Sequence, residues 1–255
     1  SVISGLAGTG KSLMAAADAL SHSIGDPRQG RPGVPTLTYI LGDLSQRDII
    51  IRFNSILTGM TFSDSAKDLR GSWQRVREAT AGRLKFVLAP AGKIRASEIV
   101  TYVKSHQEYE VVIVDYDSNL EPERGSSRGD SLYLSLGDTY NQFTELTQMG
   151  KLVYIVSQPK SFRNDENTES FGMGALGDSR KKYEVADVII TFGQYKDTNL
   201  NMGVLQLAKN RRGKKGRFYY VRPESQVRII PKGVYEYLKT RPESDGPLTE
   251  ADVVR

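Results

Sequence analysis

The sequence contains no cysteine and only two histidines among its 255 residues. Without cysteine there can be no disulfide bond and no thiolate metal site, and two histidines leave little scope for a metal cluster built from imidazole. No apolar run approaches the roughly 20 residues that a membrane-spanning helix needs, and no signal-peptide pattern opens the chain. We therefore expect no membrane association and a cytoplasmic location.

The composition is that of an ordinary globular domain. Of the 255 residues, 38% are hydrophobic and 25% are charged, which is enough to build a core beneath a polar surface. The length fits one large α/β domain. The net charge is only +5, so the distribution of basic residues is more informative than their total.

Segments typical of strands alternate with segments typical of helices along the chain. This alternation predicts an α/β fold with a mostly parallel central sheet flanked by helices, and with antiparallel edge strands near the C-terminus. We expect a loop over 26–35 and one polar helix over 66–79. In this interpretation residues 1–241 form a single domain, residues 242–255 form a polar tail, and any N-terminal domain lies outside this chain.

The strongest motif is the glycine-rich run Gly5-Leu6-Ala7-Gly8-Thr9-Gly10-Lys11-Ser12, which fits the phosphate-binding pattern G-x-x-x-x-G-K-[ST]. It follows a short apolar stretch and opens a helical segment, so the helix N-terminus faces the ligand. Glycines let backbone N–H groups wrap a phosphate, Lys11 reaches the β- and γ-phosphates, and the Ser12 hydroxyl holds Mg²⁺. A nucleoside triphosphate is the expected ligand, and its expected binding residues are Gly5, Gly8, Thr9, Gly10, Lys11 and Ser12.

Three polar residues that follow apolar strands are candidates for the rest of a nucleotide site. Asp115 ends the apolar run 111–114, where a carboxylate can help to hold Mg²⁺. Asp43 follows the predicted strand 36–41 and is placed to orient an attacking water. Gln158 follows another apolar strand, where its amide can hydrogen-bond a γ-phosphate. For Asp43 the residues alone give a weak inference, because acidic residues are common after strands. For Gln158 a turn residue facing water is an equally good interpretation.

A basic run over 209–217 holds six Lys or Arg residues in nine positions, between two predicted strands. It fits a solvated hairpin turn. It also fits a loop that contacts nucleic-acid phosphates, or an arginine finger that completes the ATP site of a neighbouring subunit. The residues of the run do not choose among these three interpretations.

Several segments, in the same order, resemble the RecA-like motor domain of the DnaB family of hexameric replicative helicases. They are Thr38-Tyr39-Ile40-Leu41-Gly42-Asp43-Leu44-Ser45 with Arg52, Ile113-Val114-Asp115-Tyr116, Ile155-Val156-Ser157-Gln158, Ser179 with Ala186-Asp187-Val188, and Lys209-Asn210-Arg211 with Gly213 and Gly216. The likeness spans the chain from Gly5 to about Tyr220 and predicts a RecA-like P-loop NTPase fold.

The resemblance implies a role for each of these segments. Asp43 is the catalytic carboxylate that polarises water, and Gln158 senses the γ-phosphate. Lys209 and Arg211 act in trans on the ATP bound by the adjacent subunit, and complete a catalytic set with Lys11. The loops after the Asp115 segment and around 178–180 face a central channel and contact single-stranded DNA through Arg124, Arg128, Asp178, Ser179 and Arg180.

The implied activity is the translocation of a homo-hexameric ring along single-stranded DNA, driven by ATP with Mg²⁺, with a primase or a helicase loader as a further partner. Two other interpretations stay open. One is a RecA-like strand-exchange protein that forms filaments, and the other is a regulatory ATP-binding module of the clock-protein kind.

The sequence departs from the family pattern at three places. The family's glutamate is Asp43 here, which is one methylene shorter. The channel loop has Gly177-Asp178-Ser179-Arg180 where the family has R-E-S-G, and Asp117-Ser118-Asn119 replace apolar residues after the aspartate–tyrosine pair. These departures suggest a divergent branch, for instance a phage or plasmid enzyme.

Overall fold

The computed structural model describes residues 1–5, 9–42, 44–123, 132–158, 180–195, 202–221 and 227–240, with the backbone alone at 132–136 and 180–181. The elements follow in chain order: β1 (Val2–Gly5), α1 (Lys11–Ile24), β2 (Gly25–Asp26), η1 (Pro27–Gln29), β3 (Arg31–Pro32), β4 (Thr36–Leu41), α2 (Gln46–Thr58), α3 (Phe62–Lys67), α4 (Leu69–Ala79), β5 (Leu84–Ala89), α5 (Ala96–Ser105), β6 (Val111–Asp115), η2 (Asp117–Asn119), α6 (Leu132–Gln148), β7 (Leu152–Ser157), α7 (Arg180–Val185), β8 (Val188–Tyr195), β9 (Met202–Asn210), β10 (Gly216–Val221), β11 (Arg228–Ile230) and α8 (Lys232–Thr240).

Within the described residues, nine strands form one central sheet in the order β11-β10-β9-β8-β1-β7-β6-β4-β5. The strands from β8 to β5 in this order run parallel, and β9, β10 and β11 add antiparallel pairs at the other side. This arrangement confirms the predicted sheet, including its antiparallel C-terminal strands. A parallel sheet needs crossover segments between its strands, and the helices supply them.

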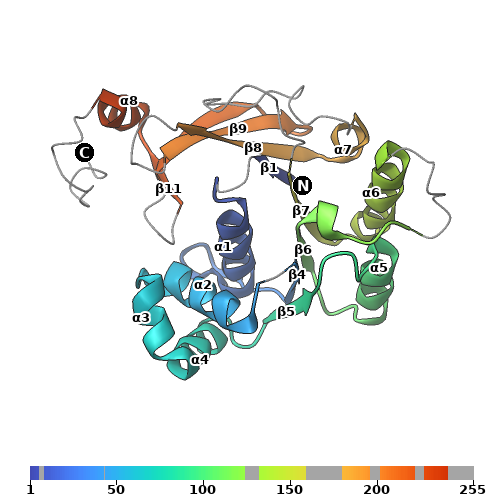
Figure 1. The fold of residues 1–255 in the computed structure, drawn as a ribbon, viewed down its shortest axis with the longest axis horizontal. Coiled ribbons are helices and arrows are strands. Elements are labelled where there is room, and N and C mark those ends of the chain that lie inside the picture. Colours follow the sequence, from blue (N-terminus) through green and yellow to red (C-terminus); the bar gives the residue numbers. More distant parts are fainter. Residues whose placement is uncertain are drawn as a thin grey trace.

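Helices cover both faces of the parallel part of the sheet (Figure 1), with α1 to α4 on one face and α5 and α6 on the other. The side chains of β4 pack on both faces of the sheet: Leu37 and Tyr39 lie in the core layer that includes α5 and α6, whereas Ile40 lies in the layer that includes α1 and α2. All six residues of β4 are buried. A strand covered on both faces has no position for a polar side chain facing water.

Three local features differ from the sequence predictions. The expected polar helix over 66–79 is two helices, because the extended backbone of Asp68 (φ −131°, ψ 76°) interrupts it and the Asp68 carboxylate caps α4 by accepting from the Gly71 N–H. The expected loop over 26–35 contains the short hairpin β2–β3. Helix α8 was not predicted, although Val234, Tyr235 and Leu238 bury one of its faces against the C-terminal strands. The expected tail 242–255 lies outside the described residues.

Candidate functional site

Four neighbouring parallel strands end at the same edge of the sheet. The sheet order places β7 between β1 and β6, and β4 on the far side of β6. The phosphate-loop motif follows β1, Gln158 follows β7, Asp115 ends β6, and Gly42 follows β4. The crevice beyond the carboxyl ends of parallel strands is the usual ligand site of an open α/β sheet. The topology therefore brings together motifs that are distant in sequence.

Two glycines of the phosphate loop have backbone positions that exclude larger residues. A Cβ on Gly5 would lie 2.8 Å from the Cβ of Phe192 on the adjacent strand β8, so Gly5 allows the close approach of the two strands. Gly10 has a left-handed conformation, with φ 102°, and directly precedes α1. Because glycine has no side chain, it leaves the first N–H groups of α1 open to an anion. Gly8 lies outside the described residues.

Lys11 and Thr9 are both buried next to this helix N-terminus. Burial lowers the pKa of Lys11 to about 8, because the ammonium loses water, although the charge of Asp115 acts in the opposite direction. A lysine in this condition gains from a nearby phosphate, which supplies negative charge at short range. The environment of Lys11 therefore suits an anionic ligand.

Ser12 and Asp115 meet directly across the sheet edge. The Ser12 hydroxyl donates to Oδ1 of Asp115 at 3.1 Å. Burial raises the pKa of Asp115, while the Ser12 hydrogen bond and the charges of Arg52 and Lys11 lower it. A hydroxyl and a buried carboxylate are oxygen donors of the kind that Mg²⁺ takes in phosphate sites, where phosphate oxygens and waters supply the other ligands. The residues present therefore fit Mg²⁺.

A cavity of about 190 Å³ opens beside this pair. Its lining comes from the start of α1, from the ends of β4 and β6 with the turns that follow them, and from the turn after β5: Ser12, Ile40, Leu41, Gly42, Leu44, Ala91, Asp115, Tyr116 and Asn119. The Asn119 amide donates to the Leu41 carbonyl at 2.7 Å and so fixes one turn against the other. Asp43 lies outside the described residues, but both of its neighbours, Gly42 and Leu44, line this cavity.

Arg52 of α2 adds a positive charge near the same carboxylate. Burial lowers its pKa, and Asp115 and Asp48 oppose that shift. The family resemblance included Arg52 but gave it no role. Only the packing of α2 beside β4 shows that it contributes to the field at Asp115.

Gln158 is exposed at the end of β7, between the strand that carries the phosphate loop and the strand that carries Asp115. The residue before it, Ser157, is buried and pairs in register with Ser4 of β1. The sheet therefore fixes the backbone from which Gln158 projects.

Lys209 and Arg211 lie at the opposite edge of the sheet from this site. Ile189 of β8 pairs with both Lys209 and Val2, whereas Phe192, further along β8, pairs with Gly5. Lys209 is thus level with the start of β1, and the phosphate loop follows the end of β1. Both basic residues therefore lie away from the carboxyl ends of the parallel strands, where the phosphate-loop motif is found.

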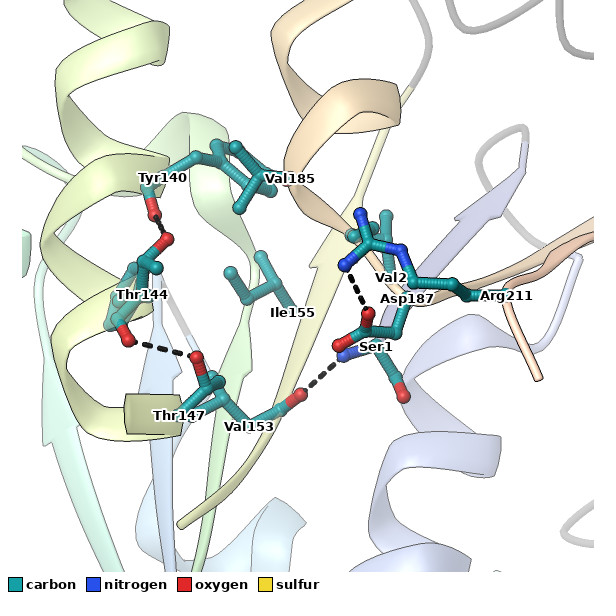
Figure 2. A pocket seen from close by; sticks show the side chains of 12 residues that line it. Ser1, Val2, Tyr140, Thr144, Thr147, Val153, Ile155, Val185, Asp187 and Arg211 are labelled. Carbon is teal, nitrogen blue, oxygen red and sulfur yellow. Dashed lines mark hydrogen bonds and ion pairs between the residues drawn. The ribbon is translucent and has the colours of Figure 1, made fainter. Parts of the chain in front are cut away.

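At that opposite edge Arg211 is held by contacts within the chain (Figure 2). Its Nη1 lies 2.7 Å from Oδ1 of Asp187, and its Nη2 donates to the carbonyl of Glu184 at 3.2 Å. Lys209 Nζ donates to the carbonyl of Tyr183. The Arg211 and Asp187 side chains are 54% and 58% exposed, so water screens this ion pair and another anion can compete for the arginine.

The residues predicted to contact DNA are not tested by the structure. Arg124, Arg128, Asp178 and Ser179 lie outside the described residues. Arg180 is the first residue of α7, so its backbone is helical where the sequence predicted a loop.

In the part of the chain that is described, no helix is long and apolar enough to cross a membrane, and no three His, Asp or Glu side chains cluster as a metal site.

Solved structures of ATPase domains share this fold. One, titled as an ATPase domain, superposes with a TM-score of 0.69 at 14% identity, over 89% of this chain and 82% of that chain. A second is titled as the structure of a DnaB-like replicative helicase and its interactions with primase, with the same TM-score of 0.69 and 14% identity over 89% of this chain. This chain spans 57% of the length of that second protein. No protein-family model and no curated protein sequence matches.

At this identity the similarity establishes the fold. The chain has the RecA-like α/β fold of DnaB-like helicase ATPase domains, as the sequence resemblance predicted. The roles of individual residues do not follow from the fold, because one fold can carry many functions.

Proposed function

We propose that this chain is the ATPase motor of a ring-forming helicase that moves along single-stranded DNA, and that it hydrolyses ATP at the contacts between subunits. The observation that carries the proposal is the Ser12–Asp115 hydrogen bond at the phosphate-loop helix, with Lys11 buried beside it. A hydroxyl, a carboxylate and a lysine at a helix N-terminus are the groups that P-loop enzymes use for a triphosphate with Mg²⁺.

In this proposal each group of the site has one task. The N–H groups of the phosphate loop and Lys11 bind the β- and γ-phosphates, and Ser12 with Asp115 holds Mg²⁺, which neutralises charge that develops on the phosphates. Asp43 orients the attacking water, and Gln158 contacts the γ-phosphate. DNA binding is mainly to phosphates through 124–128 and 178–180, so it is tolerant of sequence and sensitive to salt.

The position of Lys209 and Arg211 supports the shared site between subunits. Both lie at the edge of the sheet away from their own phosphate loop, so the ATP that they contact belongs to a neighbour in a closed homo-hexamer. A contact with that γ-phosphate replaces the exposed Arg211–Asp187 pair, and hydrolysis releases it. Such a motor works on DNA in the cytoplasm, where a primase or a loader is its partner.

The first test is the ATPase rate with and without single-stranded DNA. We expect DNA to stimulate hydrolysis by wild type. We expect Lys11→Ala to abolish ATP hydrolysis with and without DNA, because the γ-phosphate loses its lysine.

The second test mixes Arg211→Ala with wild type at fixed total protein. If Arg211 acts in trans, one variant subunit also impairs its neighbour, so activity falls below simple dilution.

The neighbouring Arg212→Ala is the matched control, because Arg212 is also basic and exposed in the same hairpin. In mixtures with wild type, the ATPase activity with Arg212→Ala should fall only in proportion to the fraction of variant protein. The same proportional fall in mixtures with Arg211→Ala would contradict the trans role. Filaments in place of rings in electron micrographs with ATP and DNA would indicate a strand-exchange protein, and hydrolysis without DNA stimulation would indicate a regulatory ATPase.

A further inference from the structure

A buried charged pair lies just behind the candidate site. Asp117 Oδ2 and Lys182 Nζ are 2.7 Å apart, and their side chains are 0% and 7% exposed. Asp117 begins η2, two residues after Asp115, and Lys182 belongs to α7. The pair therefore connects the end of β6 with a helix that is distant in sequence.

Two hydroxyls extend this pair into a hydrogen-bonded circuit of four side chains, which runs from Tyr140 through Asp117 and Lys182 to Ser157. Lys182 Nζ also donates to Ser157 Oγ at 2.6 Å, and the Tyr140 hydroxyl donates to Asp117 Oδ2 at 2.8 Å. Lys182 Nζ further lies 5.6 Å from the centre of the Tyr140 ring. The circuit thus joins the ends of β6 and β7 to α6 and α7.

Stability alone is a poor explanation for this arrangement. A buried ion pair loses hydration that its mutual attraction only partly offsets, and an apolar pair of similar volume is often equally stable. Asp117 Oδ1 is also buried without a hydrogen-bond partner among the residues that the structure describes. What the pair provides is a fixed geometry, because each charge is located by more than one directional contact.

The residue that this geometry fixes most directly is Ser157, the last residue of β7. Gln158 follows it and projects from the same strand end. We propose that Lys182 and Asp117 are positioning residues, which hold the end of β7 so that Gln158 can contact the γ-phosphate and which link α7 to that contact. This inference rests on the proposed ATPase function and assigns no contact with the nucleotide to either residue.

The test removes the charges while keeping the shapes. In the double variant D117N/K182M both side chains keep nearly their size, so no unpaired charge is buried and we expect Tm to stay near that of wild type. We expect kcat for ATP to fall about 10- to 100-fold, as small misplacements of catalytic groups do, with KM within about twofold. We also expect the preference for a non-hydrolysable ATP analogue over ADP, measured by equilibrium binding, to be lost.

Two further variants make the result decisive. Ser157→Ala removes only the hydroxyl that joins Lys182 to β7 and leaves the ion pair, so a smaller loss in kcat and in ATP-over-ADP preference is expected. The pair Lys104–Glu145 joins α5 to α6 on the exposed surface, and K104M/E145Q serves as the control with wild-type kinetics.

Each outcome is distinguishable. Wild-type kcat and wild-type preference for the ATP analogue in Ser157→Ala and in a folded D117N/K182M would overturn the positioning role and leave the ATPase proposal intact. If D117N/K182M does not fold, Ser157→Ala decides by the same two measurements. Wild type that neither hydrolyses ATP nor prefers its analogue over ADP would overturn the proposed function and this inference together.

Discussion

At the scale of single residues, the candidate site is a set of opposite charges placed where water is scarce. Lys11, Arg52 and Asp115 are each shifted first by burial, in the direction that favours the neutral form, and then partly restored by one another. Buried ionisable groups with shifted pKa values are costly to the folded state, and they are common at sites where a protein binds a charged ligand. A nucleotide with Mg²⁺ adds charges of both signs and fits this balance.

Asp18 of α1 is a simpler case of the same physics. Burial raises its pKa from 3.8 to about 6. When folding raises the pKa of a carboxyl group, its contribution to stability is fully present at pH values below the pKa of the unfolded state. This contribution is lost as the pH rises through the pKa of the folded state. The stability of the wild type should therefore fall between about pH 4 and pH 6 on account of Asp18.

The variant Asp18→Asn tests this linkage. We expect it to raise the free energy of unfolding at pH 7 by about 1 to 2 kcal/mol, because a neutral amide replaces a poorly hydrated carboxylate, and to have no such effect below about pH 4. Denaturant unfolding at several pH values measures it. The exposed Asp138→Asn is the control. An equal gain from Asp18→Asn at every pH would contradict the assignment.

At the scale of elements, the local sequence sets where each helix begins. Ser45 starts α2 with a reciprocal capping box: its hydroxyl accepts from the Asp48 N–H at 3.2 Å, and the Asp48 carboxylate accepts from the Ser45 N–H at 3.1 Å. The Ser45 hydrogen bonds lower the pKa of Asp48. The cap matters for the site, because α2 carries Arg52 and begins directly after the loop that lines the cavity.

Ser45→Ala should weaken this helix start. The Asp48 N–H loses its acceptor, which costs about 1 kcal/mol and lowers Tm by about 2 to 4 °C in a domain of this size. Ser45→Asn, which retains a capping oxygen, should have a Tm close to that of wild type. Thermal unfolding followed by circular dichroism measures both. Equal losses from the two substitutions would show that the hydroxyl cap is not the stabilising contact.

At the scale of the whole molecule, the antiparallel C-terminal strands are connected to the phosphate loop. The Tyr220 hydroxyl of β10 lies between two carbonyl acceptors, 3.2 Å from that of Thr9 and 3.0 Å from that of Gly193, and its single proton is shared between them. The contact crosses from the far strands of the sheet to the start of α1.

Tyr220→Phe tests this connection. The loss of one hydroxyl between two buried carbonyls should lower stability by about 1 to 2 kcal/mol and should weaken the binding of ATP, because Thr9 belongs to the phosphate loop. Tyr219→Phe, on the opposite face of the same strand, is the control and should leave ATP affinity unchanged. Denaturant unfolding curves measure the change in stability, and titration calorimetry measures the affinity for ATP. Unchanged ATP affinity in Tyr220→Phe would mean that the contact is only structural.

The sequence by itself determined the sheet and the motifs at its edge. Apolar strands and the spacing of the phosphate loop are local patterns, because they depend on residues within a few positions of one another. The end of the helix at Asp68 was missed, since the same residue can continue a helix or cap the next one. Helix α8 was missed because its apolar face is short and is stabilised mainly by the strands that it covers.

Only the tertiary structure decided which distant residues meet. The Ser12–Asp115 contact, the approach of Arg52 and the buried circuit of Asp117, Lys182, Ser157 and Tyr140 all join segments that are far apart in sequence. Sheet register, not local pattern, placed Lys209 and Arg211 at the edge away from their own phosphate loop. The physical reason is that strand order and packing set these distances, and no short run of sequence encodes them.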